Sequence, residues 1–187
     1  MQERPGLVRI FVAILVLFGT ACGPCNLLSS DVPTPPHPIA VSTEAAAQLE
    51  SRIQQNLGGE PGQQFIMRMT DAEVTSLVAT KLDEYGDSPI SDPQIWFTKG
   101  KIYGTGRLSN VVPLETPFYV VAMARIEDGR VIVSIEESSA GSLLIPDGLL
   151  DTVSESINET VDDLQLEVTV TALEILEGEM IVKGIRQ

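Results

Sequence analysis

The chain has very few of the side chains that most enzymes use for catalysis. Its two cysteines are Cys22 and Cys25, and its one histidine is His37, so residues 43–187 contain neither type. This excludes Cys–His and Ser–His–Asp nucleophilic catalysis from that stretch. It also excludes zinc sites built from His and Cys, and an internal disulfide. We therefore expect no catalytic residues, no cofactor and no metal.

Basic residues are scarce as well. Twelve Lys and Arg stand against 26 Asp and Glu, and the formal net charge is −14. A chain of this charge is poorly suited to contact phosphate backbones, so we expect no nucleic-acid binding. With so many acids, adjacent pairs such as Glu136-Glu137 and Asp162-Asp163 are expected by chance. An enzyme using carboxylates alone would need a desolvated pair, and it is kept as a third hypothesis.

The N-terminus has the parts of an export signal. Arg4 and Arg9 precede an apolar run over residues 10–18, which is too short to span a bilayer. The small residues 19–21 follow, and then Cys22. The segment resembles a bacterial lipobox in which Gly19 stands where leucine is usual. It predicts a lipoprotein signal peptide over 1–21 and lipidation of Cys22, including an acyl chain such as palmitate.

The segment is also compatible with three other patterns. An uncleaved membrane anchor and ordinary secretion remain as alternatives to lipidation. The Cys22-Gly23-Pro24-Cys25 tetrapeptide also matches a thioredoxin redox pair, which needs a preceding strand and a following helix. Residues 33–38 contain four prolines and cannot continue a helix. We therefore expect a lipid anchor on the extracytoplasmic face of a bacterial membrane, a Pro-rich tether over 22–42, and one acidic domain over 43–187.

The pattern of apolar residues predicts an α+β fold for this domain. A capping box at Thr70 and Glu73 opens the second of three predicted helices. Lys99-Gly100 and Asp128-Gly129 are typical of hairpin turns. We expect a curled, mostly antiparallel sheet of six to seven strands with three helices packed on it. The predicted helices are 43–57, 71–85 and 146–163, and the predicted strands are 64–69, 94–98, 101–111, 117–127, 130–138, 165–176 and 179–185.

The strand over 118–124 is apolar on both of its faces. It is either a central strand covered by two layers or a strand that curls around a groove for an apolar ligand. Trp96 and Phe97 point to opposite faces of their own strand, so one of them could line such a groove. The candidate lining residues are Trp96, Phe97, Phe118, Tyr119, Val120, Val121 and Met123.

Several segments in order resemble the LmeA-like and YpmS-like groups of small bacterial domains that carry an N-terminal membrane segment. The capped helix is TDAEVTSL over 70–77, the strand with a Gly turn is IWFTKGKIYGTG over 95–106, and a GSLLIP segment over 141–146 precedes a helix. The resemblance covers about 64–163. It implies a curled sheet with a long helix, akin to tubular lipid-binding folds. It carries over no catalytic residue.

These observations favour a membrane-anchored extracytoplasmic lipoprotein that binds lipid or another apolar ligand and is not an enzyme. The alternative is a structural module that binds another envelope protein, whose identity the sequence does not give. The two hypotheses predict different apolar surfaces. Ligand binding predicts an internal cavity, whereas protein binding predicts an exposed apolar patch.

Overall fold

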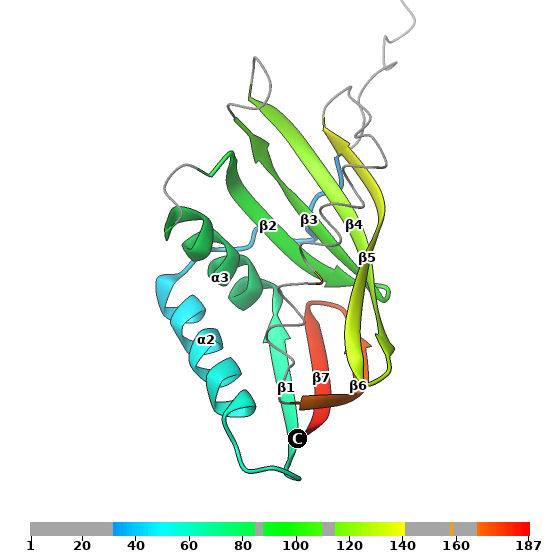
Figure 1. The fold of residues 1–187 in the computed structure, drawn as a ribbon. Helices are drawn as coiled ribbons and strands as arrows, with labels where there is room; N and C mark the ends of the chain where they lie inside the picture. Colours follow the sequence, from blue (N-terminus) through cyan, green and yellow to red (C-terminus); the bar gives the residue numbers. More distant parts are fainter. Residues whose placement is uncertain (1–31, 85–87, 110–114, 141–157, 159–167) are drawn as a thin grey trace, which may run out of the picture.

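The computed structural model describes residues 32–84, 88–109, 115–140, 158 and 168–187, which form two helices and seven strands (Figure 1). Every strand pair is antiparallel, so the predicted α+β class and antiparallel pairing are confirmed. The elements are α2 (Thr43–Leu57), β1 (Gln64–Thr70), α3 (Asp71–Glu84), β2 (Ile90–Thr98), β3 (Lys101–Leu108), β4 (Thr116–Glu127), β5 (Arg130–Ala140), β6 (Val168–Ile175) and β7 (Glu179–Arg186).

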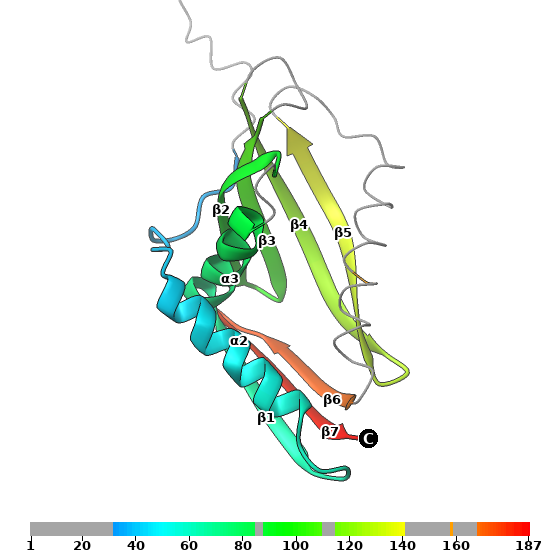
Figure 2. The same ribbon diagram turned by 60° about the vertical axis from the view of Figure 1, so that its left-hand side comes forward.

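The strands form two sheets, so the expectation of one curled sheet is wrong. One sheet has the order β1-β7-β6 and the other the order β2-β3-β4-β5. Figure 2 shows the two sheets at an angle, with α2 and α3 along one side. Of the three expected helices, the described residues contain α2 and α3. The third, over 146–163, lies outside the described residues except for Asn158.

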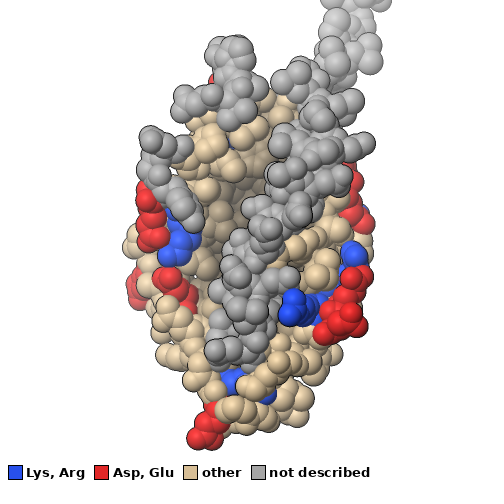
Figure 3. Space-filling view, in the orientation of Figure 1, with Lys and Arg blue, Asp and Glu red and all other residues tan. Residues whose placement is uncertain are grey.

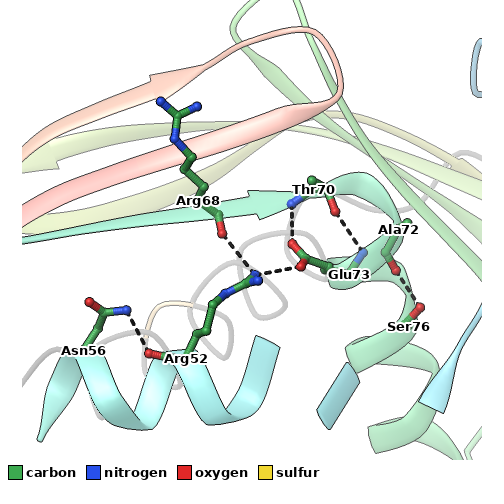
Figure 4. Close-up of polar contacts among 7 residues, drawn as sticks. All are labelled: Arg52, Asn56, Arg68, Thr70, Ala72, Glu73 and Ser76. Atoms are coloured by element: carbon green, nitrogen blue, oxygen red, sulfur yellow. Dashed lines mark hydrogen bonds and ion pairs between the residues drawn. The ribbon is translucent and has the colours of Figure 1, made fainter. Parts of the chain in front are cut away.

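Both helices begin at an N-terminal cap, and the sequence predicts the second of the two. Ser42 precedes α2, and its side chain accepts a hydrogen bond from the amide of Ala45. At the start of α3, the Glu73 carboxylate accepts from the Thr70 amide at 3.0 Å, and Thr70 Oγ1 accepts from the Glu73 amide at 3.4 Å (Figure 4). The reciprocal pair confirms the capping box and turns the chain from β1 directly into α3.

Buried polar side chains of α3 hold the outer edge of β2, and we call this contact the α3–β2 junction. Thr75 Oγ1 accepts from the Ile95 amide at 2.9 Å and donates to the Ile95 carbonyl at 3.0 Å. Asp71 Oδ1 accepts from the Phe97 amide at 2.8 Å. Four helical residues rise about 6.0 Å and two strand residues about 6.6 Å, so the two spacings match.

This junction explains why the sheet ends at β2. The backbone groups of Ile95 and Phe97 that face outward are already hydrogen-bonded to α3 or to the β6–β7 turn, so they offer nothing to β1. β1 therefore pairs with β7 instead, in the register Gln64 to Ile185. Hairpin turns in the sequence predict which consecutive strands pair. They contain no signal that the strands divide into two sheets between β1 and β2.

Residues before α2 also contact the domain. The Gln94 carboxamide exchanges two hydrogen bonds of 3.3 Å with the backbone of Ile39, which is buried. Ser76 Oγ accepts from the Ser42 amide at 3.0 Å and donates to the carbonyl of Ala72. The last part of the segment that the sequence assigns to a tether is thus held against β2 and α3.

The two sheets touch through the backbone at two turns. The Val170 amide of β6 donates to the Gly129 carbonyl in the β4–β5 turn at 2.7 Å. At the other contact, the Gly178 amide in the β6–β7 turn donates to the Phe97 carbonyl at 2.9 Å, and the Gly178 carbonyl accepts from Asp71. Asp128 and Gly129 both have positive φ, as a two-residue type I′ turn requires. These contacts fix the sheets relative to each other.

Candidate functional site

A cavity of about 230 Å³ lies between the two sheets and the last turns of α2. Thirteen described residues line it, and twelve of them are apolar. They come from α2, from all three strands of the smaller sheet, and from β3, β4 and β5. The lining residues are Ile53, Asn56, Phe65, Met67, Met69, Ile102, Ala124, Val131, Val133, Val168, Val170, Met180 and Val182.

Strand alternation builds the wall on the side of the smaller sheet. Phe65, Met67 and Met69 point inward from β1, whereas Ile66 between them is 62% exposed on the outer face. Phe65 lies opposite Gly184 of β7, and a Cβ at Gly184 would come within 2.6 Å of the Phe65 ring. Glycine therefore allows the ring to lie flat against β7, which shapes this wall.

The opposite wall is one face of the larger sheet. Ile102, Ala124 and Val133 share this face through the pairs of β3 with β4 and of β4 with β5. At the outer edge of β5, the Asn158 carboxamide forms two hydrogen bonds of 2.8 Å with the amide and carbonyl of Val133. The amide side chain thus occupies backbone groups of an edge strand directly at the cavity wall.

Asn56 is the polar residue of the described wall. Its Nδ2 donates to the Arg52 carbonyl at 2.8 Å within α2. Arg52 itself reaches outward, where it contacts the Arg68 carbonyl and pairs with Glu73 at 2.8 Å (Figure 4). Burial alone would raise the pKa of Glu73, but the Thr70 hydrogen bonds and Arg52 together lower it. These charges stabilise the joint between α2, β1 and α3 rather than the cavity.

None of the seven residues that the sequence nominates as lining belongs to the described wall of this cavity. The register places Phe97, Phe118 and Val120 on the cavity-facing side of the larger sheet. Phe97 is nearly fully buried. Phe118 lies over Gly106, where a Cβ would come within 2.8 Å of the ring. The three therefore continue the apolar face beyond this cavity.

The other four nominated residues lie on the opposite face of the larger sheet, because they alternate with the first three. Trp96 stacks on Tyr103 with 5.2 Å between ring centroids, and Val121 is buried beside this pair in the register. The Tyr119 hydroxyl donates to Glu137 at 2.6 Å, and this bond raises the pKa of Tyr119. Met123 is 39% exposed. The structure does not bring the seven together.

The sequence contained a weaker signal for the actual wall. Three of the five methionines, Met67, Met69 and Met180, line the cavity. The first two alternate along β1, and Met69 pairs with Met180 across the strands. Methionine is an unbranched, adaptable side chain that fills irregular space and suits binding surfaces. The concentration of methionine on one face is the feature of the sequence that matches the observed wall.

Charge is absent from the described wall and gathers elsewhere. On the face that Figure 3 shows, the described surface visible between the grey residues is mostly uncharged, and acidic and basic side chains gather along its two flanks. Among the described residues, Asp71 is the one buried carboxylate, and burial raises its pKa above the ordinary 3.8 although the Phe97 amide opposes this. It belongs to the α3–β2 junction. No group of three His, Cys, Asp or Glu in the described chain could hold a metal ion.

Comparisons with known proteins leave the site to be interpreted from its own geometry. No family model, no curated protein and no solved structure gives a match to this chain. Within the described residues, no helix combines the length and apolar character needed to cross a bilayer. The cavity and its wall are therefore the observations from which a function can be argued.

Proposed function

We propose that this protein is a membrane-anchored extracytoplasmic lipoprotein that binds a lipid or another apolar ligand without catalysing a reaction. The observation that carries the proposal is the apolar cavity of about 230 Å³ between the two sheets. Ligand sites in proteins are concave and mostly apolar, with few polar groups in their walls. One polar residue among thirteen described wall residues fits that description.

The energy of an empty cavity supports a ligand. Native interiors contain few voids larger than a water molecule. The cavity is partly open to solvent, so its apolar wall is in contact with water when no ligand is bound, which is unfavourable. Water would find one polar residue in the described wall, whereas an ordered water needs two to four polar partners. An apolar ligand would remove this cost, and water would not.

The anchor is supported by the sequence alone. Cys22 and the signal over 1–21 lie outside the described residues. Several acyl chains on one cysteine give stable membrane attachment, where a single chain is marginal. The anchor would keep the cavity close to a supply of apolar molecules. A Cys22→Ala variant should leave the membrane fraction and lose the gel shift of lipidation; unchanged partitioning and mobility would contradict the anchor.

Ligand binding can be tested on the chain from residue 22 with Cys22→Ser, which needs no lipid and keeps every described residue. The protein is incubated with a lipid extract of bacterial membranes, and bound mass is measured by native mass spectrometry. We expect adducts on this chain and their loss in Met67→Trp, which fills the cavity. Ile66→Trp places the same side chain on the outer face of β1 and should keep the adducts.

The outcomes separate the hypotheses. Absence of adducts from the parent chain, with every lipid class in the extract, would overturn ligand binding. Equal adducts in Met67→Trp and Ile66→Trp would show that binding occurs at another place. In either case the competing hypothesis of a module that binds an envelope protein would become the stronger one.

A further inference from the structure

The size of the cavity limits the ligand more closely than its apolar character does. An apolar cavity of about 150 Å³ accommodates benzene, which has six carbon atoms. By the same ratio, a cavity of 230 Å³ accommodates about nine carbon atoms. A phospholipid with two long chains has several times that number. The volume therefore fits one short or medium hydrocarbon chain.

The wall favours a flexible linear chain. Met67, Met69 and Met180 form a continuous part of it on two neighbouring strands. Their side chains have three rotatable bonds and can follow the changing conformations of an alkyl chain. Small or branched residues, such as Ala124 and Val133, face them from the larger sheet. A rigid ring system would gain less from such an adaptable surface.

The polar groups near the cavity form hydrogen bonds with other parts of the protein. Asn56 uses Nδ2 for the Arg52 carbonyl, and its Oδ1 points away from that bond (Figure 4). Arg186 contacts the Asn56 carbonyl through Nε at 2.7 Å. Its other two nitrogens donate to Gln63 Oε1 and the Gln55 carbonyl, so three neutral acceptors hold its guanidinium at this place. Arg186 is not among the described residues that line the cavity, and the described wall itself contains no charged side chain.

From these observations we infer that the cavity binds a single unbranched hydrocarbon chain of about nine carbons whose head group is uncharged, such as a medium-chain alcohol. The inference rests on the proposed function and narrows its ligand class. An ionised carboxylate inside the described wall would lose hydration without meeting a cation, and the net charge of −14 would repel it. A head that stays neutral avoids both penalties.

The test is a series of straight-chain 1-alkanols from six to fourteen carbons, titrated calorimetrically into the Cys22→Ser chain from residue 22. Each buried methylene contributes about 0.8 kcal/mol, so the dissociation constant should fall about fourfold per carbon. The fall should stop near nine or ten carbons, when the cavity is full. Met67→Trp should move this limit to shorter chains, and Ile66→Trp should leave it unchanged.

The head is tested by comparing 1-decanol with decanoate at pH 8. We expect the alcohol to bind at least tenfold more tightly. Equal affinities would overturn the uncharged head, and a dissociation constant that still falls beyond twelve carbons would overturn the single medium chain. Either result leaves the proposed function standing. Failure of every alkanol and of every membrane lipid to bind would overturn both.

Discussion

The α3–β2 junction and the cavity are two interiors of opposite character in one small domain. At the junction, the buried polar residues Asp71, Thr75 and Ser76 all have hydrogen-bond partners. In the cavity, twelve apolar residues surround space that no described side chain fills. The hydrogen-bonded contacts that position the sheets and the unfilled volume therefore lie in different parts of the domain. The junction determines where the sheets lie, and the cavity is what their placement leaves between them.

Removing the Thr75 hydroxyl should destabilise the α3–β2 junction more than any other change proposed for the domain. Thr75→Val would leave the Ile95 amide and carbonyl without their partner in a buried place. We expect the free energy of unfolding to fall by about 2–4 kcal/mol. Urea unfolding followed by circular dichroism measures it. Thr75→Ser keeps the hydroxyl and should lose about 1 kcal/mol for its methyl group. A Val variant as stable as the Ser variant would show that the two bonds contribute nothing.

Asp71 offers a second test at the junction, through pH. Because burial raises its pKa in the folded protein, the folded state favours the protonated form. Its contribution to stability is therefore greatest below the ordinary pKa of 3.8 and is lost as the pH rises through the folded value. Asp71→Asn keeps an acceptor for the Phe97 amide without the charge. Relative to this variant, the parent should lose stability as the pH rises from 4 to 7.

Two variants control the Asp71 experiment. Asp71→Ala removes the acceptor and should lower the free energy of unfolding by about 1–3 kcal/mol at all pH values. Glu73, with a lowered pKa, contributes stability above its ordinary 4.5 that is lost as the pH falls. It is present in both proteins, so it cancels in the difference between parent and Asp71→Asn. A difference that grows more favourable to the parent with rising pH would contradict the assigned direction.

Filling the cavity should have a smaller effect, of the opposite sign. Ala124→Leu adds three carbons toward the void, and we expect the free energy of unfolding to rise by about 1 kcal/mol after some strain. Ala122 lies two residues earlier on the same face, but it is buried and does not line the cavity. Ala122→Leu should lower stability by about 1–3 kcal/mol. Equal losses in both variants would show that the space beside Ala124 cannot accept a side chain.

The smallest effect is expected on the outer face of β1. Arg68 pairs with Glu179 at 3.2 Å, and its side chain is 63% exposed. Surface pairs of this kind are worth little, so Arg68→Ala should change the free energy of unfolding by less than about 0.5 kcal/mol. Thermal unfolding in low and high salt measures it. A larger loss would mean that the outer face of β1 also stabilises the smaller sheet.

The sequence predicted the local structure well because local signals determine it. The caps at Ser42 and Thr70 and the turns at Lys99-Gly100 and Asp128-Gly129 each act within four residues. The start and end of α2 at Thr43 and Leu57 agree with the prediction. The α+β class follows from the same signals, since they distinguish helices from strands without reference to distant contacts.

The break between the sheets and the site depended on distant partners, which periodicity does not report. Thr75 and Asp71 look like ordinary polar positions of a helix until β2 is placed beside them. Likewise, alternation shows that Phe65 and Met67 face inward, but not whether anything fills the space before them. The apolar pattern over 118–124 indicates a packed part of the larger sheet. It does not indicate the cavity, which lies elsewhere between the two sheets.

The pairing of β1 with β7 has a consequence for how the chain folds as it emerges. Gln64 meets Ile185, so the small sheet joins the early part of the domain to its last eight-residue strand. Long-range pairing of this kind is slow, because a large loop must close, at a cost in entropy, before the contacts between the two strands can form. The α3–β2 contacts, only 20 to 26 residues apart, can form much earlier. A chain that emerges from its N-terminus during synthesis would expose the apolar side of β1 until β7 follows.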